Sequence, residues 1–431
     1  MVINNRLRTI NIRKRTPQEW LVFTFFIMPF ALAFLTEILG LPSFIRYLMD
    51  LLVVGLSVML FANRYFVIST KAKPMLTLAA LFFLYTLIVY LLNFQSPFYF
   101  LWGARNTFRF YLAFLIFIAY VSQEEAFSWL KLLDILFWLH FVVTVFQFVV
   151  IKPHQDRLGG IFGVSSPTSG YVLLFFCVVI GKSLLQAFDG KEQYTLCIIK
   201  CLVSLLLAAM AEIKFYYFAF VVILILTAGL TRFSKGKIAL IVAAAFGIVI
   251  GSTLLTLWFD SFDGFLSWER LWEAATKNNY ASGNDLNRLS AIFTLMNKYI
   301  TGSVQQIFGM GLGNCDTSDI SIFNSVFYQR YSYLHYGWFS SAMLFLETGF
   351  VGLVIYLTFF VLGIAYSARQ LRRNIGNTLF NRMAIVMSVM CIAITFYNAS
   401  LRVESGYMAY FVLALPFLDR EEEDRASCEA A

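Results

Sequence analysis

The chain has 431 residues, of which 60% are hydrophobic and 13% are charged, and its mean hydropathy is +0.73. A soluble protein needs a polar exterior, so this composition excludes a soluble globular domain and indicates a protein with many membrane-spanning helices. The formal net charge is +8, but the basic residues are dispersed between apolar segments, which argues against a nucleic-acid-binding protein.

Apolar segments of spanning length follow one another along most of the chain. A transmembrane helix needs about 20 mostly apolar residues. The segment from Trp20 to Leu39 has this length and lacks a small-residue cleavage site, so we expect a first transmembrane helix and not a cleaved signal peptide. We therefore predict an all-α protein with about twelve transmembrane helices, within a range of about eleven to thirteen. The predicted spans are 20–39, 44–62, 75–93, 106–122, 129–151, 168–188, 194–211, 213–231, 238–258, 338–366, 379–397 and 406–418.

Basic residues in the loops predict the orientation of these spans. Cytoplasmic loops of membrane proteins carry an excess of lysine and arginine. With the N-terminus in the cytoplasm, the loops on that side hold most of the basic residues, and both termini lie inside. The inner basic residues are Arg6, Arg8, Arg13, Lys14, Arg15, Arg64, Lys71, Lys73, Lys182, Lys191, Arg232, Lys235, Lys237, Arg369, Arg372 and Arg373.

This orientation divides the chain into four parts. Residues 1–258 hold the first nine helices and short outer loops, and residues 259–337 form one large outer loop. Residues 338–418 hold the last three helices, and residues 419–431 form an acidic cytoplasmic tail. A chain that crosses a bilayer repeatedly and then builds one large outer loop is expected to place its chemistry at that loop.

Two features of the large loop carry structural expectations. Apolar residues at helical spacing over 286–300 predict an amphipathic helix on the outer membrane surface, with Arg288 in its first turn. The run F-G-M-G-L-G allows a tight turn at Gly309, Gly311 and Gly313. It lacks the third glycine and the βαβ context of a dinucleotide-binding fingerprint, so it is only a weak candidate for a phosphate-binding loop. The apolar stripe consists of Leu286, Leu289, Ile292, Phe293 and Met296.

Basic residues on the outer side are conspicuous because they depart from the positive-inside pattern. Charges at a membrane boundary tend to face a protein interior or an aqueous cavity, although any single one can instead extend to the lipid headgroups. A basic cavity that opens outward suits an anionic amphiphile such as a polyprenyl diphosphate, since the arginine fork pairs bidentately with phosphate oxygens. The candidate diphosphate-binding residues are Arg157, Lys214, Arg288, Arg105 and Arg402.

His335 is the candidate general base, because it precedes a span and histidine titrates near neutral pH. The structural alternative is an interfacial histidine in an aromatic belt with its tyrosine and tryptophan neighbours. Glu347, about three turns into the next helix, needs a partner and could be paired with an arginine, so it is a secondary candidate together with Glu212. The outer loops contain no H-E-x-x-H motif, Cys/His cluster or Asp-x-Asp pair that would indicate a metal site.

The order of these motifs resembles the O-antigen ligase/polymerase superfamily of bacterial inner-membrane proteins, the Wzy polymerase and WaaL ligase type. The matching elements are the Arg157 loop with R-L-G-G-I-F, the Lys214 turn between two close spans, and the outer loop with Arg288. They continue with F-G-M-G-L-G and end with H-Y-G-W and E-T-G-F-V-G-L after His335. The chain departs from the family in Thr168, where relatives often have asparagine. It departs also in Lys214, where arginine is common, and in Tyr336, where asparagine is common.

The resemblance implies a GT-C-type helical fold and the transfer of a glycan from undecaprenyl diphosphate to a hydroxyl on the outer face of the inner membrane. It implies no cofactor or metal, His335 as general base, and Arg288 with the other outer basic residues as the diphosphate clamp. We favour a polymerase of O-antigen, capsule or exopolysaccharide, whose partners are the lipid-linked donor and acceptor, membrane lipid and a chain-length regulator. The alternatives are an O-antigen ligase with a lipid or protein acceptor, a lipid-linked oligosaccharide flippase, a peptidoglycan polymerase and a membrane receptor.

Overall fold

A computed structural model describes residues 16–62, 71–153, 157–164, 168–232, 235–258, 285–318 and 320–418. These residues form helices, turns and loops, and no strand occurs among them. The prediction of an all-α protein is therefore confirmed for this part of the chain. The predicted acidic tail and most of the N-terminal basic segment lie outside the described residues, as does the first part of the large loop.

Each of the twelve predicted spans coincides with a helix. Eight of the described helices are long and apolar enough to cross a membrane, which identifies a polytopic helical membrane protein. The helices α7, α8 and α16 are apolar but shorter, and α4 carries two arginines, so the number of spans stays a prediction. The bounds are α1 Pro17–Ala33, extended by the π-helical turn η1 Phe34–Ile38; α2 Tyr47–Ala62; α3 Lys73–Leu92; α4 Pro97–Tyr120; α5 Gln123–Phe146, extended by the π-helical turn η3 Gln147–Ile151; α6 Ser169–Phe188; α7 Tyr194–Met210; α8 Lys214–Gly229; α9 Lys235–Trp258; α14 Ser340–Arg373; α15 Thr378–Tyr397; and α16 Gly406–Ala414.

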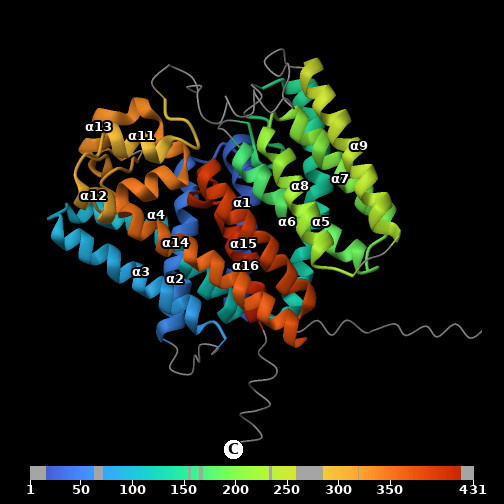
Figure 1. The fold of residues 1–431 in the computed structure, drawn as a ribbon, viewed down its shortest axis with the longest axis horizontal. Helices are drawn as coiled ribbons and strands as arrows, with labels where there is room; N and C mark the ends of the chain where they lie inside the picture. The colour runs from blue at the N-terminus through green and yellow to red at the C-terminus, as the bar shows by residue number, and fades with distance from the viewer. Residues whose placement is uncertain are drawn as a thin grey trace, which may run out of the picture.

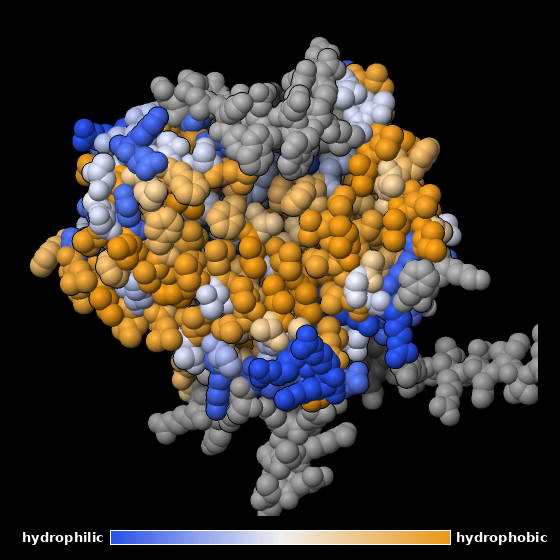
Figure 2. Space-filling model, in the orientation of Figure 1, coloured by the Kyte–Doolittle hydropathy of each residue, from blue (hydrophilic) through white to orange (hydrophobic). Residues whose placement is uncertain are grey.

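The helix ends follow local sequence signals. Thr16 begins α1 with a capping box, in which its side chain accepts from the Glu19 amide and the Glu19 carboxylate accepts from the Thr16 amide. Ser122 and Glu125 begin α5 in the same way. The sides of the helices that face outward are rich in apolar residues, and Figure 2 shows them as a broad orange band between blue patches. An apolar band of this kind is the surface that a bilayer covers.

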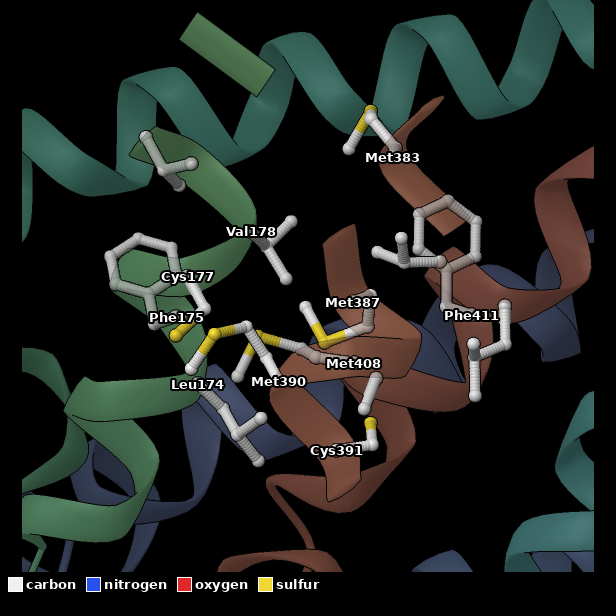
Figure 3. Packing of buried hydrophobic residues seen from close by; sticks show 14 of the residues in the cluster. Leu174, Phe175, Cys177, Val178, Met383, Met387, Met390, Cys391, Met408 and Phe411 are labelled. Carbon is white, nitrogen blue, oxygen red and sulfur yellow. The ribbon is translucent and has the colours of Figure 1, made fainter. Parts of the chain in front are cut away.

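The centre of the molecule is formed by α15 and α16, with α5 to α9 on one side and α3 with the outer helices on the other (Figure 1). Figure 3 shows how residues of α6, α15 and α16 pack there without polar contacts. The labelled residues are Leu174, Phe175, Cys177, Val178, Met383, Met387, Met390, Cys391, Met408 and Phe411. Close packing makes this centre rigid, and it therefore fixes the loop 398–405 that joins α15 to α16.

The structure corrects the predicted place of Lys182, which is in α6 and not in a cytoplasmic loop. Its side chain is buried, pairs with Asp134 of α5, and donates to the Leu130 carbonyl at 2.8 Å. Lys200 of α7 lies 3.0 Å from the same aspartate and 2.8 Å from Glu192. A lysine near the end of an apolar helix can be a loop residue or a buried ion-pair partner, and loop composition alone does not separate these cases.

Residues 285–339, as far as they are described, belong to the loop predicted to lie outside and are named the outer segment. This segment packs its own small core, the outer core, against the first half of α14. It contains the short helices α11 Ala291–Lys298, α12 Ser303–Phe308 and α13 Val326–Tyr331. Figure 1 shows these helices together at the upper left, near the end of α3. The core residues are Leu286, Ala291, Leu295, Ile300, Cys315, Leu334, Tyr336, Phe339, Ala342, Met343, Phe345 and Leu346.

The helix predicted over 286–300 is wrong at its beginning, because α11 begins only at Ala291. The Asn287 side chain accepts from the Leu289 amide at 3.4 Å, and such an asparagine turn competes with the first turn of a helix. The buried face of α11 carries Ala291 and Leu295, whereas Leu289 and Phe293 of the predicted stripe are 52% and 62% exposed. Arg288 therefore lies in a turn before the helix.

Candidate active site

The α15–α16 loop, residues 398–405, carries Arg402 and contacts the start of α14, which follows His335, and the start of α6. The Asn398 carbonyl accepts two hydrogen bonds from Ser340, one from the Ser340 amide at 3.1 Å and one from the Ser340 hydroxyl at 2.9 Å. These bonds join the loop to the turn after His335. Ser400 packs against Gly170 at the start of α6, where a Cβ atom would lie 2.4 Å from the serine hydroxyl. The loop is thus in contact with both the outer segment and the helix bundle.

His335 and Asp285 form a pair within the outer segment. The Nδ1 atom of His335 lies 2.8 Å from Oδ1 of Asp285. The histidine has left-handed backbone angles, with φ of 50°, and its ring stacks on Trp338 at 4.2 Å between centroids. The imidazole side chain is 38% exposed, whereas the aspartate side chain is fully buried. A carboxylate on Nδ1 fixes the tautomer in which Nε2 can accept a proton.

Asp285 is held in place by the backbone beside it. The next residue, Leu286, donates its amide to the Leu334 carbonyl at 3.1 Å, and both leucines are buried in the outer core. The two chain segments that carry the pair are therefore hydrogen-bonded to each other next to the pair itself. This arrangement fixes the distance between the aspartate and the histidine.

Arg288 and the Lys214 turn meet at Tyr397, the last residue of α15. The guanidinium carbon of Arg288 lies 4.0 Å from the centroid of the Tyr397 ring. Phe215, the neighbour of Lys214, stacks on the same ring at 3.9 Å with an interplanar angle of 17°. Two groups at these short distances from one centroid must occupy opposite faces of the ring, so the three planar groups form one stack.

Lys214 is the first residue of α8 and follows a tight turn. Glu212 has φ of +56°, and its carbonyl accepts from the Lys214 amide at 3.0 Å. The lysine ammonium group lies 3.8 Å from the Glu212 carboxylate, and the lysine side chain is 41% exposed. Glu212 is therefore an ion-pair partner of Lys214.

The loop that carries Arg157 is anchored by the two π-helical turns. The side chain of Gln147 in η3 forms two hydrogen bonds with the backbone of Gly160. It donates to the Gly160 carbonyl at 2.8 Å and accepts from the Gly160 amide at 2.7 Å. Glu37 in η1 accepts from the Val164 amide at 3.0 and 2.9 Å. Turns of this kind often occur at functional sites. The anchored loop presents Arg157 as an exposed side chain.

Arg402 and Glu347 are paired inside the protein. The Arg402 guanidinium group lies 3.1 Å from Asp316 and 3.5 Å from Glu347, and Glu347 also accepts from the Gly313 amide at 2.9 Å. Burial lowers the pKa of Arg402, but Glu347 and Asp316 outweigh it and raise this pKa above its ordinary value, so the guanidinium group is charged. The expectation that Glu347 is a partner of an arginine is therefore confirmed by the geometry.

Arg105 lies in the same network from the side of α4. Its Nε donates to Asp50 at 3.0 Å, and Arg109, one turn deeper, lies 3.2 Å from Asp50 and 3.3 Å from Glu404. Burial raises the pKa of Glu404, but Arg109 and the Tyr171 hydroxyl outweigh it and bring this pKa below its ordinary value. Arg105 and Arg402 are thus already paired with carboxylates.

The glycines of F-G-M-G-L-G serve close backbone packing. Gly313 has φ of +84°, and a Cβ atom there would lie 1.8 Å from the Tyr99 carbonyl at the start of α4. A Cβ atom at Gly309 would lie 2.4 Å from the Glu347 carbonyl, next to a break in α14 at Gly349. These contacts explain the glycines without a phosphate.

The residues of this site that the sequence did not single out are Asp285 as the histidine partner and Tyr397. Asp285 is 50 positions from His335, and an acidic residue in a polar loop carries no local signal of such a contact. In the described parts of the chain, no three His, Cys, Asp or Glu side chains are grouped as metal ligands.

Comparison with known proteins gives no relative, because no family model and no curated protein matches the chain.

Proposed function

We propose that the protein is a glycan polymerase that transfers a saccharide from a polyprenyl diphosphate to a hydroxyl of a second lipid-linked repeat. The observation that carries the proposal is the contact of His335 with Asp285, at the end of the molecule where Arg288 and the Lys214 turn meet. An oriented base beside fixed cations is what this transfer needs.

The donor side of the reaction uses Arg288, Lys214 and Arg157. The diphosphate is a good leaving group, so it requires stabilisation of its developing negative charge and no protonation. Fixed cations supply that stabilisation, and arginine can bind two phosphate oxygens at once. The stack on Tyr397 fixes Arg288, the ion pair with Glu212 restrains Lys214, and the Gln147 anchor holds the Arg157 loop.

The acceptor side uses His335. The acceptor hydroxyl oxygen attacks the anomeric carbon of the donor while Nε2 of His335 takes the hydroxyl proton, and the bond from the anomeric carbon to the phosphate oxygen breaks. The bonding electrons leave with the diphosphate. The imidazolium formed in this step is stabilised by the buried Asp285 carboxylate on Nδ1 until the proton passes to water. The products are a longer lipid-linked glycan and a free polyprenyl diphosphate.

Arg105 and Arg402 take a different role in this proposal from the one that the sequence suggested. Their carboxylate partners compensate their charge, so they hold the α15–α16 loop and the start of α4 in place around the site. A diphosphate would have to displace those carboxylates to bind there. We therefore assign the direct diphosphate contacts to Arg288, Lys214 and Arg157.

The proposal places the protein in the plasma membrane of a bacterium, with both termini in the cytoplasm and the site on the outer face. The distribution of basic loop residues supports this orientation. The substrates are an undecaprenyl-diphosphate-linked donor and acceptor, which reach the site from the outer leaflet. A chain-length regulator is the expected protein partner of such a polymerase.

The test is an assay of the purified full-length protein in nanodiscs with a lipid-linked repeat unit, scored for a ladder of longer glycans. We expect a ladder without added nucleotide, and the ladder should persist in chelator. The His335→Ala protein should form none. Transfer of a single unit to a lipid A core acceptor, without a ladder, would assign a ligase. Movement of the lipid-linked repeat across the bilayer, unaffected by His335→Ala, would assign a flippase.

A further inference from the structure

In the short helix α12, Ser303–Phe308, one polar side chain points inward while three apolar side chains are exposed beside Ser303 and Gln305. The Gln306 amide points inward, where it donates to the Ile300 carbonyl at 2.7 Å and to the Met296 carbonyl at 3.1 Å. The apolar side chains point away from the protein, and Val304 is 70% exposed. In contact with water, the amide would face outward and the apolar groups inward. The exposed apolar residues of α12 are Val304, Ile307 and Phe308.

The neighbouring helix α13 has a mixed outward side. Gln329 and Arg330 are exposed there together with Val326, which is 70% exposed, while Phe327 packs against the outer core. The Arg330 charge and the Gln329 amide suit water or the headgroup region, so Gln329 is a polar reference position on the same segment.

The depth of α12 is set by its contact with the spanning helix α3. The Tyr85 hydroxyl donates to the Phe308 carbonyl at 3.0 Å and to the Thr348 carbonyl of α14 at 2.7 Å. Tyr85 precedes Leu92, the last residue of α3, by seven positions. Seven residues correspond to about 10 Å along a helix axis. The C-terminal end of α12 therefore contacts α3 about two turns before the end of that helix.

The apolar surface of α12 continues the apolar surface at the end of α3. Phe94 in the turn between α3 and α4 is 95% exposed and has φ of +46°, an uncommon angle for an aromatic residue. In Figure 2 the orange surface extends to the edge of the view where Figure 1 places the end of α3. The exposed apolar residues of this end of α3 and the start of α4 are Leu91, Leu92, Phe94, Phe98 and Leu101.

Part of the backbone around α12 is hydrogen-bonded, which a lipid environment favours. The backbone amide of Gln306 donates to the Gly302 carbonyl at 3.0 Å, and the backbone amide of Gly309 donates to the Gln305 carbonyl at 2.8 Å. The chain after the helix bonds to α14, where the Met310 amide donates to a carbonyl at 2.9 Å.

We propose that α12 is embedded in the outer leaflet of the membrane and that phospholipid acyl chains cover Val304, Ile307 and Phe308. The helix packs against the break in α14, since a Cβ atom at Gly349 would lie 2.3 Å from the Ile307 carbonyl. It anchors the outer segment, including His335 and Arg288, to the bilayer beside α3. In this proposal α12 makes a membrane contact for the outer segment.

The test uses a depth-sensitive fluorophore, NBD, on the full-length protein in nanodiscs of phosphatidylcholine with bromine on the acyl chains. The labelled variants are Val304→Cys and Ile307→Cys, and the matched control is Gln329→Cys on α13. Labelling of the parent protein gives the background from its own cysteines. We expect the emission of both α12 labels to be shifted to the blue and quenched at least twofold more by the brominated lipid than that of the control.

Equal quenching of the α12 labels and the control would overturn the proposal. The proposal would also be overturned if the α12 labels shifted to the blue only after a second membrane protein was added, because a protein would then cover them. Because either cysteine variant could disturb folding, each is accepted only if its melting temperature matches that of the parent. The two positions lie one turn apart, so one folded variant is sufficient for the test. This inference does not depend on the proposed reaction.

Discussion

The Nδ1 atom of His335 lies 2.8 Å from the Oδ1 atom of Asp285, and the aspartate is buried while the imidazole is accessible. The contact fixes the ring by one nitrogen and leaves the other as the proton acceptor. It also compensates the positive charge that the ring acquires when it takes a proton. An interfacial histidine of an aromatic belt needs no such partner, so the contact favours the general-base interpretation.

The first prediction concerns this pair. His335→Ala should lower the rate of ladder formation by about 10²–10⁴-fold, the range for loss of a general base. Asp285→Asn should lower the rate too, because an amide no longer favours the productive tautomer or stabilises the imidazolium. The measurement is the initial rate of glycan extension with purified protein in nanodiscs. Trp338→Phe, which keeps a ring beside the imidazole, is the matched control and should remain active. A rate near wild type for His335→Ala would rule out the role of His335.

The second prediction concerns Tyr397 as a positioning residue for Arg288. A cation–π contact at an exposed site is worth about 0.5–1 kcal/mol, which corresponds to about a two- to fivefold change in affinity. Tyr397→Leu should therefore raise the KM for the donor by about that factor, while Tyr397→Phe should stay near wild type because it keeps the ring. The readout is the split between KM and kcat, together with binding of undecaprenyl diphosphate. An equal loss in both variants would assign the effect to the hydroxyl group.

The spans could be predicted from the sequence because lipid selects continuous apolar segments, and this signal is local. Residues whose position depends on a neighbour in space could not be predicted in this way. Lys182 is an example, since its burial depends on Asp134 of another helix. The late start of α11 is another, because the Asn287 side chain competes with the helix.

The site could be predicted in part for the same reason. The sequence indicates His335, Arg288 and Lys214 by their residue types and by their positions beside predicted spans. Their partners come from distant segments: Asp285 is 50 positions from His335, and Tyr397 belongs to a helix that follows the outer loop. Arg402 had the right charge and side for a diphosphate ligand, but its two carboxylate partners appear only when α14 and the glycine loop are folded.

The third prediction tests whether Arg402 is structural. Removing one member of a buried ion pair leaves the other charge uncompensated, at a cost of about 3–5 kcal/mol. Arg402→Ala should therefore lower the melting temperature, and the double variant Arg402→Met with Glu347→Gln should recover part of the loss. The measurement is thermal unfolding in nanodiscs. Arg288→Ala is the control, which should lose activity with little change in stability. A stable but inactive Arg402→Ala protein would instead return Arg402 to the diphosphate clamp.

The fourth prediction concerns acid stability. The pKa of Glu404 in the folded protein lies below its ordinary value, as a result of Arg109 and Tyr171 outweighing burial. A carboxylate with a lowered pKa contributes stability above its unfolded pKa of about 4.3, and this contribution is lost as the pH falls through the folded pKa. The melting temperature should therefore fall in acid more steeply for the wild type than for Glu404→Gln. Parallel curves for the two proteins would contradict this.

The last prediction concerns the loop formed by the F-G-M-G-L-G run with Gly309, Gly311 and Gly313. Gly313→Ala places a Cβ atom 1.8 Å from the Tyr99 carbonyl, at a residue with φ of +84°. The alanine can be accommodated only if the loop moves away from α4, and the strain together with the clash should cost on the order of 3 kcal/mol. Gly337→Ala is the matched control, because a Cβ atom there meets no atom within 4 Å. We expect a lower melting temperature and little ladder formation for Gly313→Ala, and near-wild-type behaviour for Gly337→Ala. If Gly313→Ala instead kept its stability and lost only donor binding, these glycines would be a phosphate-binding loop after all.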